Sequence, residues 1–221
     1  MAGLVPAIQV FCFGDSVKTW MPGTSSAKTR FCPGKTAVLM PPLEYAMKVI
    51  GLAGWSGAGK TTLLTRAIPQ LQKQGLRVSV IKHAHHAFDV DVPGKDSWKH
   101  REAGAAEVLV SSSQRWALMR ELRGASEPRL PELLAKMSRV DLVVVEGFKR
   151  EPHRKIEVFR AANGKPLLFP DDPGIVGIAT DTPVETTLPT AHLDDIEAIA
   201  AMMLRSAISV EEVLAKSEAE S

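Results

Sequence analysis

The sequence predicts a three-layer α/β domain with a mostly parallel sheet. Short apolar runs alternate along the chain with amphipathic segments, as they do when helices join the strands of a parallel sheet. One apolar run leads through a glycine-rich loop into an amphipathic segment, and a second, at residues 141–147, closes on a carboxylate. With 221 residues and 45% hydrophobic content, the chain is long enough for one such domain with a full core.

Composition excludes several classes of protein. The net charge is +2, which is a poor match for DNA binding through bulk charge. No window reaches 18 uninterrupted apolar residues, so we expect no transmembrane helix. Both cysteines, Cys12 and Cys32, precede residue 47, so the remainder cannot form disulfides or a cysteine-rich zinc site. These features predict a cytoplasmic protein that binds neither nucleic acid nor a membrane.

Residues 1–46 differ from the rest of the chain. They contain five prolines and four glycines without a sustained helical or strand period. Met47 is followed directly by an apolar strand pattern at residues 48–53. We therefore interpret residues 1–46 as a disordered extension or a start-site artefact, and the alternative is an N-terminal arm packed on the domain. The functional domain then spans residues 47–207, and residues 208–221 form a C-terminal helical tail.

The most specific motif follows that first strand. Residues 54–61 fit G-x-x-x-x-G-K-[ST] in full and read Gly54-Trp55-Ser56-Gly57-Ala58-Gly59-Lys60-Thr61. Glycines allow a tight loop whose N–H groups surround a phosphate, and the helix expected after it directs its positive end at the same group. Lys60 is expected to reach the β and γ phosphates, Thr61 to hold Mg²⁺ and Thr62 to touch the α-phosphate. The motif predicts a P-loop NTPase; the alternative is a glycine-rich loop that caps an unrelated helix.

The second strand, expected at residues 77–83, leads into a segment rich in histidine and aspartate, Lys82-His83-Ala84-His85-His86-Ala87-Phe88-Asp89-Val90-Asp91. We interpret it as a switch loop whose carboxylates approach Mg²⁺ and the γ-phosphate, with Asp91 the first candidate and Asp89 the second. A transition-metal site is the alternative, since imidazole and carboxylate are normal zinc ligands. No helical spacing, however, places two of these histidines on one face.

An antiparallel hairpin is expected in the middle of the chain. Residues 96–103 predict a short helix, and two strand patterns, 107–110 and 116–122, are joined by a short polar link. So short a link favours a hairpin over a parallel crossover. One of its strands must lie at a sheet edge, so we expect a second copy of the chain to pair with it in a homodimer. The alternative is that a helix expected at residues 193–206 covers this edge.

The strand pattern at residues 141–147 supplies a candidate acidic group. Its continuous apolar run indicates a strand buried on both faces, and Glu146 at its C-terminal end is expected to face Thr61. There it would coordinate Mg²⁺ through water or orient an attacking water. Glu146 and Asp91 are therefore the catalytic candidates, and both join Thr61 as metal candidates. For Glu146 the alternative is a solvated glutamate at a strand end.

The remaining patterns complete the alternation, with a helix at residues 130–137 and strands at 155–159 and 175–180. The last of these strands ends beside Asp181. A carboxylate there could accept hydrogen bonds from both N1–H and N2–H₂ of guanine, which adenine cannot supply. Capping of the turn before Pro183 is the alternative role for Asp181.

Basic residues cluster after two of the expected strands, at residues 95–101 and 149–155. In a domain whose other charges balance, they suggest a site for an anionic ligand other than the nucleotide. The alternative is that these lysines and arginines are solvated surface residues.

In combination these motifs resemble the MobB family of molybdopterin-guanine dinucleotide biosynthesis adapter proteins. The resemblance spans about residues 47–207 and rests on motifs in this order: Gly54–Thr62, Lys82–His86, Asp89–Ser97, Arg101–Ala105, Gln114–Met119 and Val145–Lys149. It implies GTP binding, slow Mg²⁺-dependent GTP hydrolysis and a homodimer. It also implies an accessory role to MobA, the guanylyltransferase that attaches GMP to molybdopterin, with the basic clusters holding the phosphate of the pterin. The Asn-Lys-x-Asp signature of many GTPases is missing.

Two other classes of function use the same loop. A P-loop small-molecule kinase would transfer the γ-phosphate to an acceptor hydroxyl, and Arg120, Arg123 and Arg129 could serve in its lid. A GTP-dependent metal chaperone would use the histidine-rich segment beside the P-loop. Product analysis separates the kinase from an adapter, and metal titration of a His85→Ala, His86→Ala double variant tests the chaperone.

Overall fold

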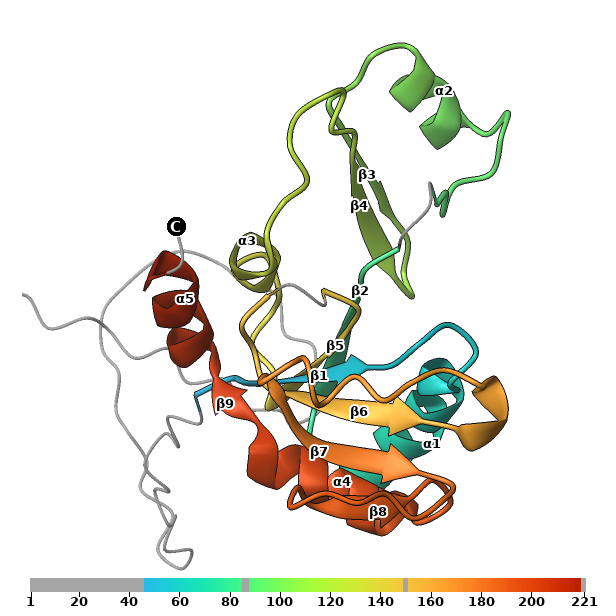
Figure 1. Cartoon of the computed structure of the whole chain (residues 1–221). Coiled ribbons are helices and arrows are strands. Elements are labelled where there is room, and N and C mark those ends of the chain that lie inside the picture. The colour runs from blue at the N-terminus through green and yellow to red at the C-terminus, as the bar shows by residue number, and fades with distance from the viewer. Residues whose placement is uncertain (1–45, 85–87, 149–150, 220–221) are drawn as a thin grey trace, which may run out of the picture. The chain divides into compact units, whose positions relative to one another are not determined.

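Parallel strands form the centre of the structure, a computed structural model that describes residues 46–84, 88–148 and 151–219 (Figure 1). The expected extension over residues 1–46 therefore lies outside the described residues, except for Ala46. The elements are β1 Lys48–Ala53, α1 Lys60–Lys73, β2 Val78–Lys82, α2 Asp96–Glu102, β3 Glu107–Ser111, β4 Trp116–Arg120, α3 Leu130–Leu134, β5 Leu142–Glu146, β6 Lys155–Phe159, the 3₁₀ helix η1 Ala161–Asn163, β7 Ile175–Thr180, β8 Thr190–His192, α4 Ile196–Ser206, β9 Ile208–Ser209 and α5 Val210–Ala219.

Seven of the described strands make one sheet. Six follow the order β2-β5-β1-β6-β7-β8 and run parallel, and β9 pairs antiparallel with the first half of β1. β1, the first described strand, lies in the middle of the sheet. The next strands, β2 and β5, lie on one side of it and β6, β7 and β8 on the other, so the strand order reverses beside β1. Loops that leave β1, β2 and β5 meet at this point, which is where ligands bind in open parallel sheets.

Helices cover both faces of the sheet, and side-chain alternation along the strands divides the core in two. Ile50 and Leu52 of β1 pack with α1 and α4 on one face. Val49 of β1 packs on the other face with buried residues of α3 and α5, including Leu134 and Val213. In β5 all five residues are buried, as expected for a central strand with helices on both sides. The predicted three-layer α/β fold is confirmed.

Strands β3 and β4 form a separate two-stranded antiparallel sheet, so the predicted hairpin is confirmed. Several of its apolar side chains are solvent-exposed, among them Trp116 at 65% and Leu109 at 60%. The alternative in which the helix at residues 193–206 covers this hairpin is wrong, because α4 packs instead against α1 and the central sheet. Within the described residues, the apolar surface of β3 and β4 is therefore left uncovered.

Three differences from the expected elements have local causes. Helix α4 begins at Ile196 rather than Leu193, because the Asp195 carboxylate caps it by accepting the Ala198 N–H at 2.9 Å. The residues just before it form β8, a short edge strand that the pattern did not predict. The C-terminal tail also starts as a strand: Ile208 pairs with Val49 and is buried in the core.

Candidate functional site

The P-loop connects β1 to α1 through backbone conformations that glycine alone adopts easily. Gly54, Gly57 and Gly59 have φ of 143°, 83° and 92°. A Cβ at Gly54 would also lie 2.5 Å from the carbonyl oxygen of Val158 on β6. The glycines of the motif are thus required both by the turn of the loop and by its close approach to the neighbouring strand.

The start of α1 offers hydrogen-bond donors to an anion. Gly59 is the N-cap and brings no side chain to bond the first turn, whose residues are Lys60, Thr61 and Thr62. The first N–H groups of a helix have no partner within it, and the helix dipole adds positive potential at the same place. The Lys60 ammonium donates to the carbonyl oxygens of Gly54 at 2.8 Å and Trp55 at 3.0 Å, so it lies across the loop. This donor set fits a chain of phosphates.

Glu146 lies where the sequence predicted it, opposite the helix start. The Thr61 hydroxyl donates to its Oε1 at 3.1 Å, and the Glu146 residue is only 8% exposed. A hydroxyl and a carboxylate are the hard oxygen donors that Mg²⁺ prefers beside a nucleotide. The residues present therefore fit a magnesium ion, and a solvated strand-end glutamate does not describe this geometry.

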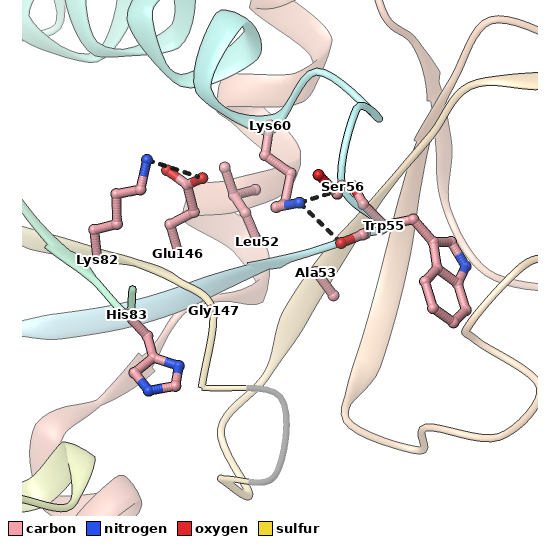
Figure 2. A pocket seen from close by; sticks show the side chains of 10 residues that line it. Leu52, Ala53, Trp55, Ser56, Lys60, Lys82, His83, Glu146 and Gly147 are labelled. Atoms are coloured by element: carbon pink, nitrogen blue, oxygen red, sulfur yellow. Dashed lines mark hydrogen bonds and ion pairs between the residues drawn. The ribbon is translucent and has the colours of Figure 1, made fainter. Parts of the chain in front are cut away.

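Lys60, Glu146 and the first part of the P-loop line one cavity of about 530 Å³, here named the P-loop cavity (Figure 2). It is large enough for a small-molecule ligand. Its walls come from β1, the P-loop, α1 and the ends of β2 and β5, and its lining residues are Leu52, Ala53, Gly54, Trp55, Ser56, Lys60, Lys82, His83, Glu146 and Gly147. Of the predicted site residues, the structure thus brings together the P-loop, Lys60, Thr61 and Glu146.

His83 follows β2 and faces the side of the sheet covered by α3. Its ring lies 4.8 Å from that of Phe148 between centroids, and its Nε2 is 2.6 Å from the Glu127 carboxylate. A Cβ on Gly147 would lie 2.7 Å from the Cβ of His83, so the glycine after Glu146 lets the two strand ends approach. His83 therefore joins the rim of the P-loop cavity to the segment before α3.

Asp91 lies among different partners from those predicted. Its carboxylate pairs with Arg101 at 3.2 Å and accepts the Ser97 hydroxyl at 2.7 Å, and it is not part of the lining of the P-loop cavity. Arg101 also contacts Asp89 at 2.9 Å and Glu121 at 2.6 Å. We name Arg101 and its three carboxylate partners, Asp89, Asp91 and Glu121, the Arg101 cluster. Hydrogen bonds from the Asp91 N–H and from Arg101 lower the pKa of Asp89, and the carboxylates raise that of Arg101. The metal role of Asp91 stays a prediction that these contacts do not favour.

Asp181 follows β7 and caps η1. Its Oδ1 accepts the N–H of Ala161 at 2.9 Å, and its Oδ2 is 3.7 Å from Arg160. The predicted alternative was a cap on the turn before Pro183. Asp181 does act as a cap, but the N–H that it accepts belongs to η1, after β6, and not to that turn. Reading of a guanine base by Asp181 stays a prediction.

Sequence reasoning missed a contact that holds the P-loop from the side. The Asn163 side-chain amide donates to the carbonyl of Ser56 at 3.0 Å, and the Trp55 indole donates to the carbonyl of Pro166 at 2.7 Å. Both partners lie in the connection between β6 and β7, more than 100 residues away in sequence. Asn163 shows no spacing relative to the motif, so only the folded chain reveals it.

Of the described residues in the second basic cluster, only Arg154 is exposed. His153 and Lys155 are buried, and the Lys155 ammonium pairs with Asp172 at 3.2 Å. Burial, and then the charge of Lys155, lowers the pKa of His153 to about 4. Glu157 on β6 is also buried. Burial raises the pKa of its carboxyl, although the carboxylate accepts two backbone N–H groups, which act in the opposite direction. In the first cluster Arg101 is taken up by carboxylates. The suggested anion site at these clusters stays a prediction, which the pairing of Arg101 and Lys155 does not favour.

The histidines that could have bound a transition metal, His85 and His86, lie outside the described residues, as do Lys149 and Arg150. Among the side chains that are described, no three metal-ligating groups come together. None of the helices in that part of the chain has the length and apolar character needed to cross a membrane.

Comparisons with known proteins agree with this geometry. The family model MobB, described as molybdopterin guanine dinucleotide synthesis protein B, matches residues 49–181. The chain is 44% identical over 155 residues to the molybdopterin-guanine dinucleotide biosynthesis adapter protein of Escherichia coli (strain K12), across 69% of this chain and 89% of that protein. It is 42% identical over 161 residues to the Haemophilus influenzae protein of the same name, across 72% and 88%.

Solved structures match over a similar extent. A crystal structure of molybdopterin-guanine biosynthesis protein B matches with a TM-score of 0.56 at 30% identity, over 71% of this chain and 98% of that chain. The crystal structure of Bacillus subtilis MobB matches with a TM-score of 0.57 at 23% identity, over 73% and 99%, and supports the fold alone.

Proposed function

The chain belongs to the MobB family, and we propose that it is a GTP-binding adapter with weak Mg²⁺-dependent GTPase activity in molybdopterin-guanine dinucleotide biosynthesis. The pathway follows from family membership. The nucleotide, the metal ion and the partner are parts of the proposal. The partner is the MobA-type guanylyltransferase that attaches GMP to molybdopterin in the cytoplasm.

The observation that carries the proposal is that Lys60 and Glu146 line one cavity and that the Thr61 hydroxyl donates to Glu146 beside it. Lys60 and the first N–H groups of α1 would hold the β and γ phosphates. Thr61 and Glu146 would hold Mg²⁺, and Glu146 is also placed to orient a water molecule for attack. Bound Mg²⁺ supplies positive charge that stabilises the departing diphosphate.

Recognition of guanine is assigned to Asp181. It follows β7, at the same edge of the parallel sheet as the P-loop after β1, and its Oδ1 accepts the Ala161 N–H. A carboxylate retains lone pairs beyond the one this N–H uses, and these can accept N1–H and N2–H₂ of guanine. Adenine lacks that pair of donors, so the assignment predicts a preference for GTP over ATP.

A homodimer through the hairpin is the third part of the proposal. Trp116, Leu118 and Leu109 of β3 and β4 are 65%, 51% and 60% exposed. Apolar side chains and open strand edges in one small sheet favour pairing with a second copy of the same element. Light scattering of the full chain at micromolar concentration should give twice the monomer mass, and a monomer mass would contradict this part alone.

Titration with GTP and ATP in parallel, with and without Mg²⁺, tests the nucleotide assignment. We expect GTP to bind at least about tenfold more tightly than ATP, since ATP lacks the two donors that the Asp181 carboxylate would accept. Product analysis should show GDP and phosphate. A phosphorylated pterin or other acceptor would favour the kinase alternative instead.

The adapter role needs its own assay. When the chain is added to a MobA-type guanylyltransferase with GTP and molybdopterin, the yield of the guanine dinucleotide should rise. The yield should not change when a Lys60→Ala variant is added. An equal rise with the variant would separate the adapter role from nucleotide binding and contradict the proposal that the two are linked.

A further inference from the structure

Lys82 is a cation of the P-loop cavity that the motif does not include. It is the last residue of β2, and its Cα pairs with that of Glu146 in the neighbouring strand β5. Leu52 of β1 pairs with the same Glu146 on the other side. Residues in register on neighbouring parallel strands point to the same face of a sheet. Leu52 packs against α1, so Lys82 and Glu146 also face α1 and the P-loop.

His83, the next residue, faces the opposite side. Its ring contacts Phe148, which packs with the core under α3 and α5. The adjacent pair Lys82 and His83 is thus divided by strand alternation. The Lys82 ammonium lies on the face of the sheet covered by α1, and the His83 imidazole lies on the face covered by α3.

The contacts of Lys82 are weak enough to exchange. Its ammonium lies 3.8 Å from Oε1 of Glu146, the same oxygen that accepts the Thr61 hydroxyl, and the Lys82 side chain is 58% exposed (Figure 2). A long ion pair whose lysine is largely in solvent contributes little to stability. The ammonium can therefore leave Glu146 for a stronger partner within the same cavity at small cost.

We propose that Lys82 is a second phosphate-binding cation, which moves from Glu146 to the terminal phosphate of a bound nucleoside triphosphate. The inference rests on the proposed function and deepens it. A triphosphate carries several negative charges where Glu146 carries one, so it is the better partner for an ammonium. Lys60 reaches the phosphates from the P-loop side, and Lys82 reaches them from the end of β2. The two lysines line opposite parts of one cavity.

The γ-phosphate is the group within reach of Lys82. Glu146 marks the place of the metal ion and the attacking water, both of which belong at the terminal phosphate in a P-loop site. A cation held beside Glu146 is therefore nearest to that end of the nucleotide. Lys82 would then distinguish a triphosphate from a diphosphate, whereas a lysine that is merely a surface counter-ion would not.

The test compares binding of two ligands, GDP and a non-hydrolysable β,γ-imido analogue of GTP, both with Mg²⁺, by calorimetric titration of the full chain. Lys82→Gln removes the charge and keeps most of the length, and Lys82→Arg restores the charge. Lys48→Gln is the matched control, because Lys48 is an exposed lysine at the first residue of β1, the end away from the P-loop. Thermal melting of each variant confirms that it is folded.

We expect Lys82→Gln to weaken binding of the analogue by about tenfold or more and to leave GDP within about twofold. Lys82→Arg should recover most of the loss, and Lys48→Gln should bind both ligands as the parent does. Equal affinity of parent and Lys82→Gln for the analogue would overturn the inference while the nucleotide site stands. An equal loss for both ligands would overturn the γ-phosphate assignment, and a parent that binds neither ligand would overturn the proposed function as well.

Discussion

The P-loop cavity and the Arg101 cluster both gather charged side chains, but they do so by different means. In the cavity, Glu146 and Lys82 end two neighbouring parallel strands, the buried β5 and the edge strand β2, and their positions follow from strand register. In the cluster, one guanidinium binds three carboxylates that arrive from a loop and from the residue after β4. The cavity keeps donors and acceptors that a ligand can engage. In the cluster the charges already satisfy one another.

This difference separates a binding site from a structural junction. In the cavity the charged groups are held apart by backbone and are only loosely paired. The Arg101 cluster fixes the segment of residues 89–121, which has few buried apolar side chains of its own. Similar charged residues therefore form a candidate binding site in the P-loop cavity and a structural junction in the Arg101 cluster.

Glu146→Gln offers the largest expected effect on the cavity. The amide keeps the size of the side chain but loses the charge that would hold Mg²⁺ and orient water. Nucleotide binding should stay close to that of the parent, and the rate of GTP hydrolysis should fall by about 10²-fold or more. Single-turnover hydrolysis measures this, with Glu185→Gln as an exposed control; hydrolysis at the parental rate would make Glu146 a bystander.

The contrast also explains what the sequence could predict. The P-loop follows from local backbone needs, since Gly54 and Gly59 must adopt positive φ within eight residues. The approach of Thr61 to Glu146 could also be predicted, because the strands before them, β1 and β5, end at the same edge of a parallel sheet. Asp91 could not be placed, because its partner is chosen by the tertiary fold: Arg101 lies ten residues on and competes with any metal for the carboxylate. Asn163 is beyond prediction for the same reason.

His153, buried just before β6, tests how strongly burial controls the charge of a side chain outside the cavity and the Arg101 cluster. His153 has its pKa lowered to about 4, chiefly by burial. Between about pH 6.5 and 4 the unfolded chain then binds more protons than the native state, so stability should rise with pH through this window. Across this window, His153 should change the free energy of unfolding by about 3 kcal/mol. Denaturant unfolding across this range should show the slope, and His153→Leu should flatten it.

A steep slope that survives in His153→Leu would assign the pH dependence to other groups. His100→Gln is the matched control, because His100 is exposed on α2 and should leave the slope as in the parent.

Arg101→Met should separate the cluster from the cavity. It leaves Asp89, Asp91 and Glu121 without their shared cation, so the melting midpoint should fall by several degrees. Triphosphate affinity and hydrolysis should stay within about twofold, since none of these residues lines the cavity. Asp91→Asn should behave in the same way. A large loss of hydrolysis with a normal melting midpoint in Asp91→Asn would restore the metal role predicted for this residue.

Asn163→Ala gives the smallest expected change. The variant removes one hydrogen bond to the P-loop, from the Asn163 amide to the Ser56 carbonyl. A single neutral bond contributes about 0.5–1.5 kcal/mol, so triphosphate affinity should fall by about two- to tenfold. Calorimetric titration measures it, with the exposed neighbour Lys165→Ala as control. Unchanged affinity would show that the P-loop keeps its shape without this contact.

The central claim is that the P-loop cavity binds a nucleoside triphosphate, and Lys60→Ala tests it most directly. With a bound triphosphate, the Lys60 ammonium would make charge-assisted bonds to more than one phosphate oxygen, each worth about 1.5–3 kcal/mol. Titration with GTP and Mg²⁺ should show binding to the parent chain and a loss of about 10²-fold or more in the variant, with the melting midpoint preserved. Equal affinity in a folded Lys60→Ala protein would contradict the assignment of this cavity.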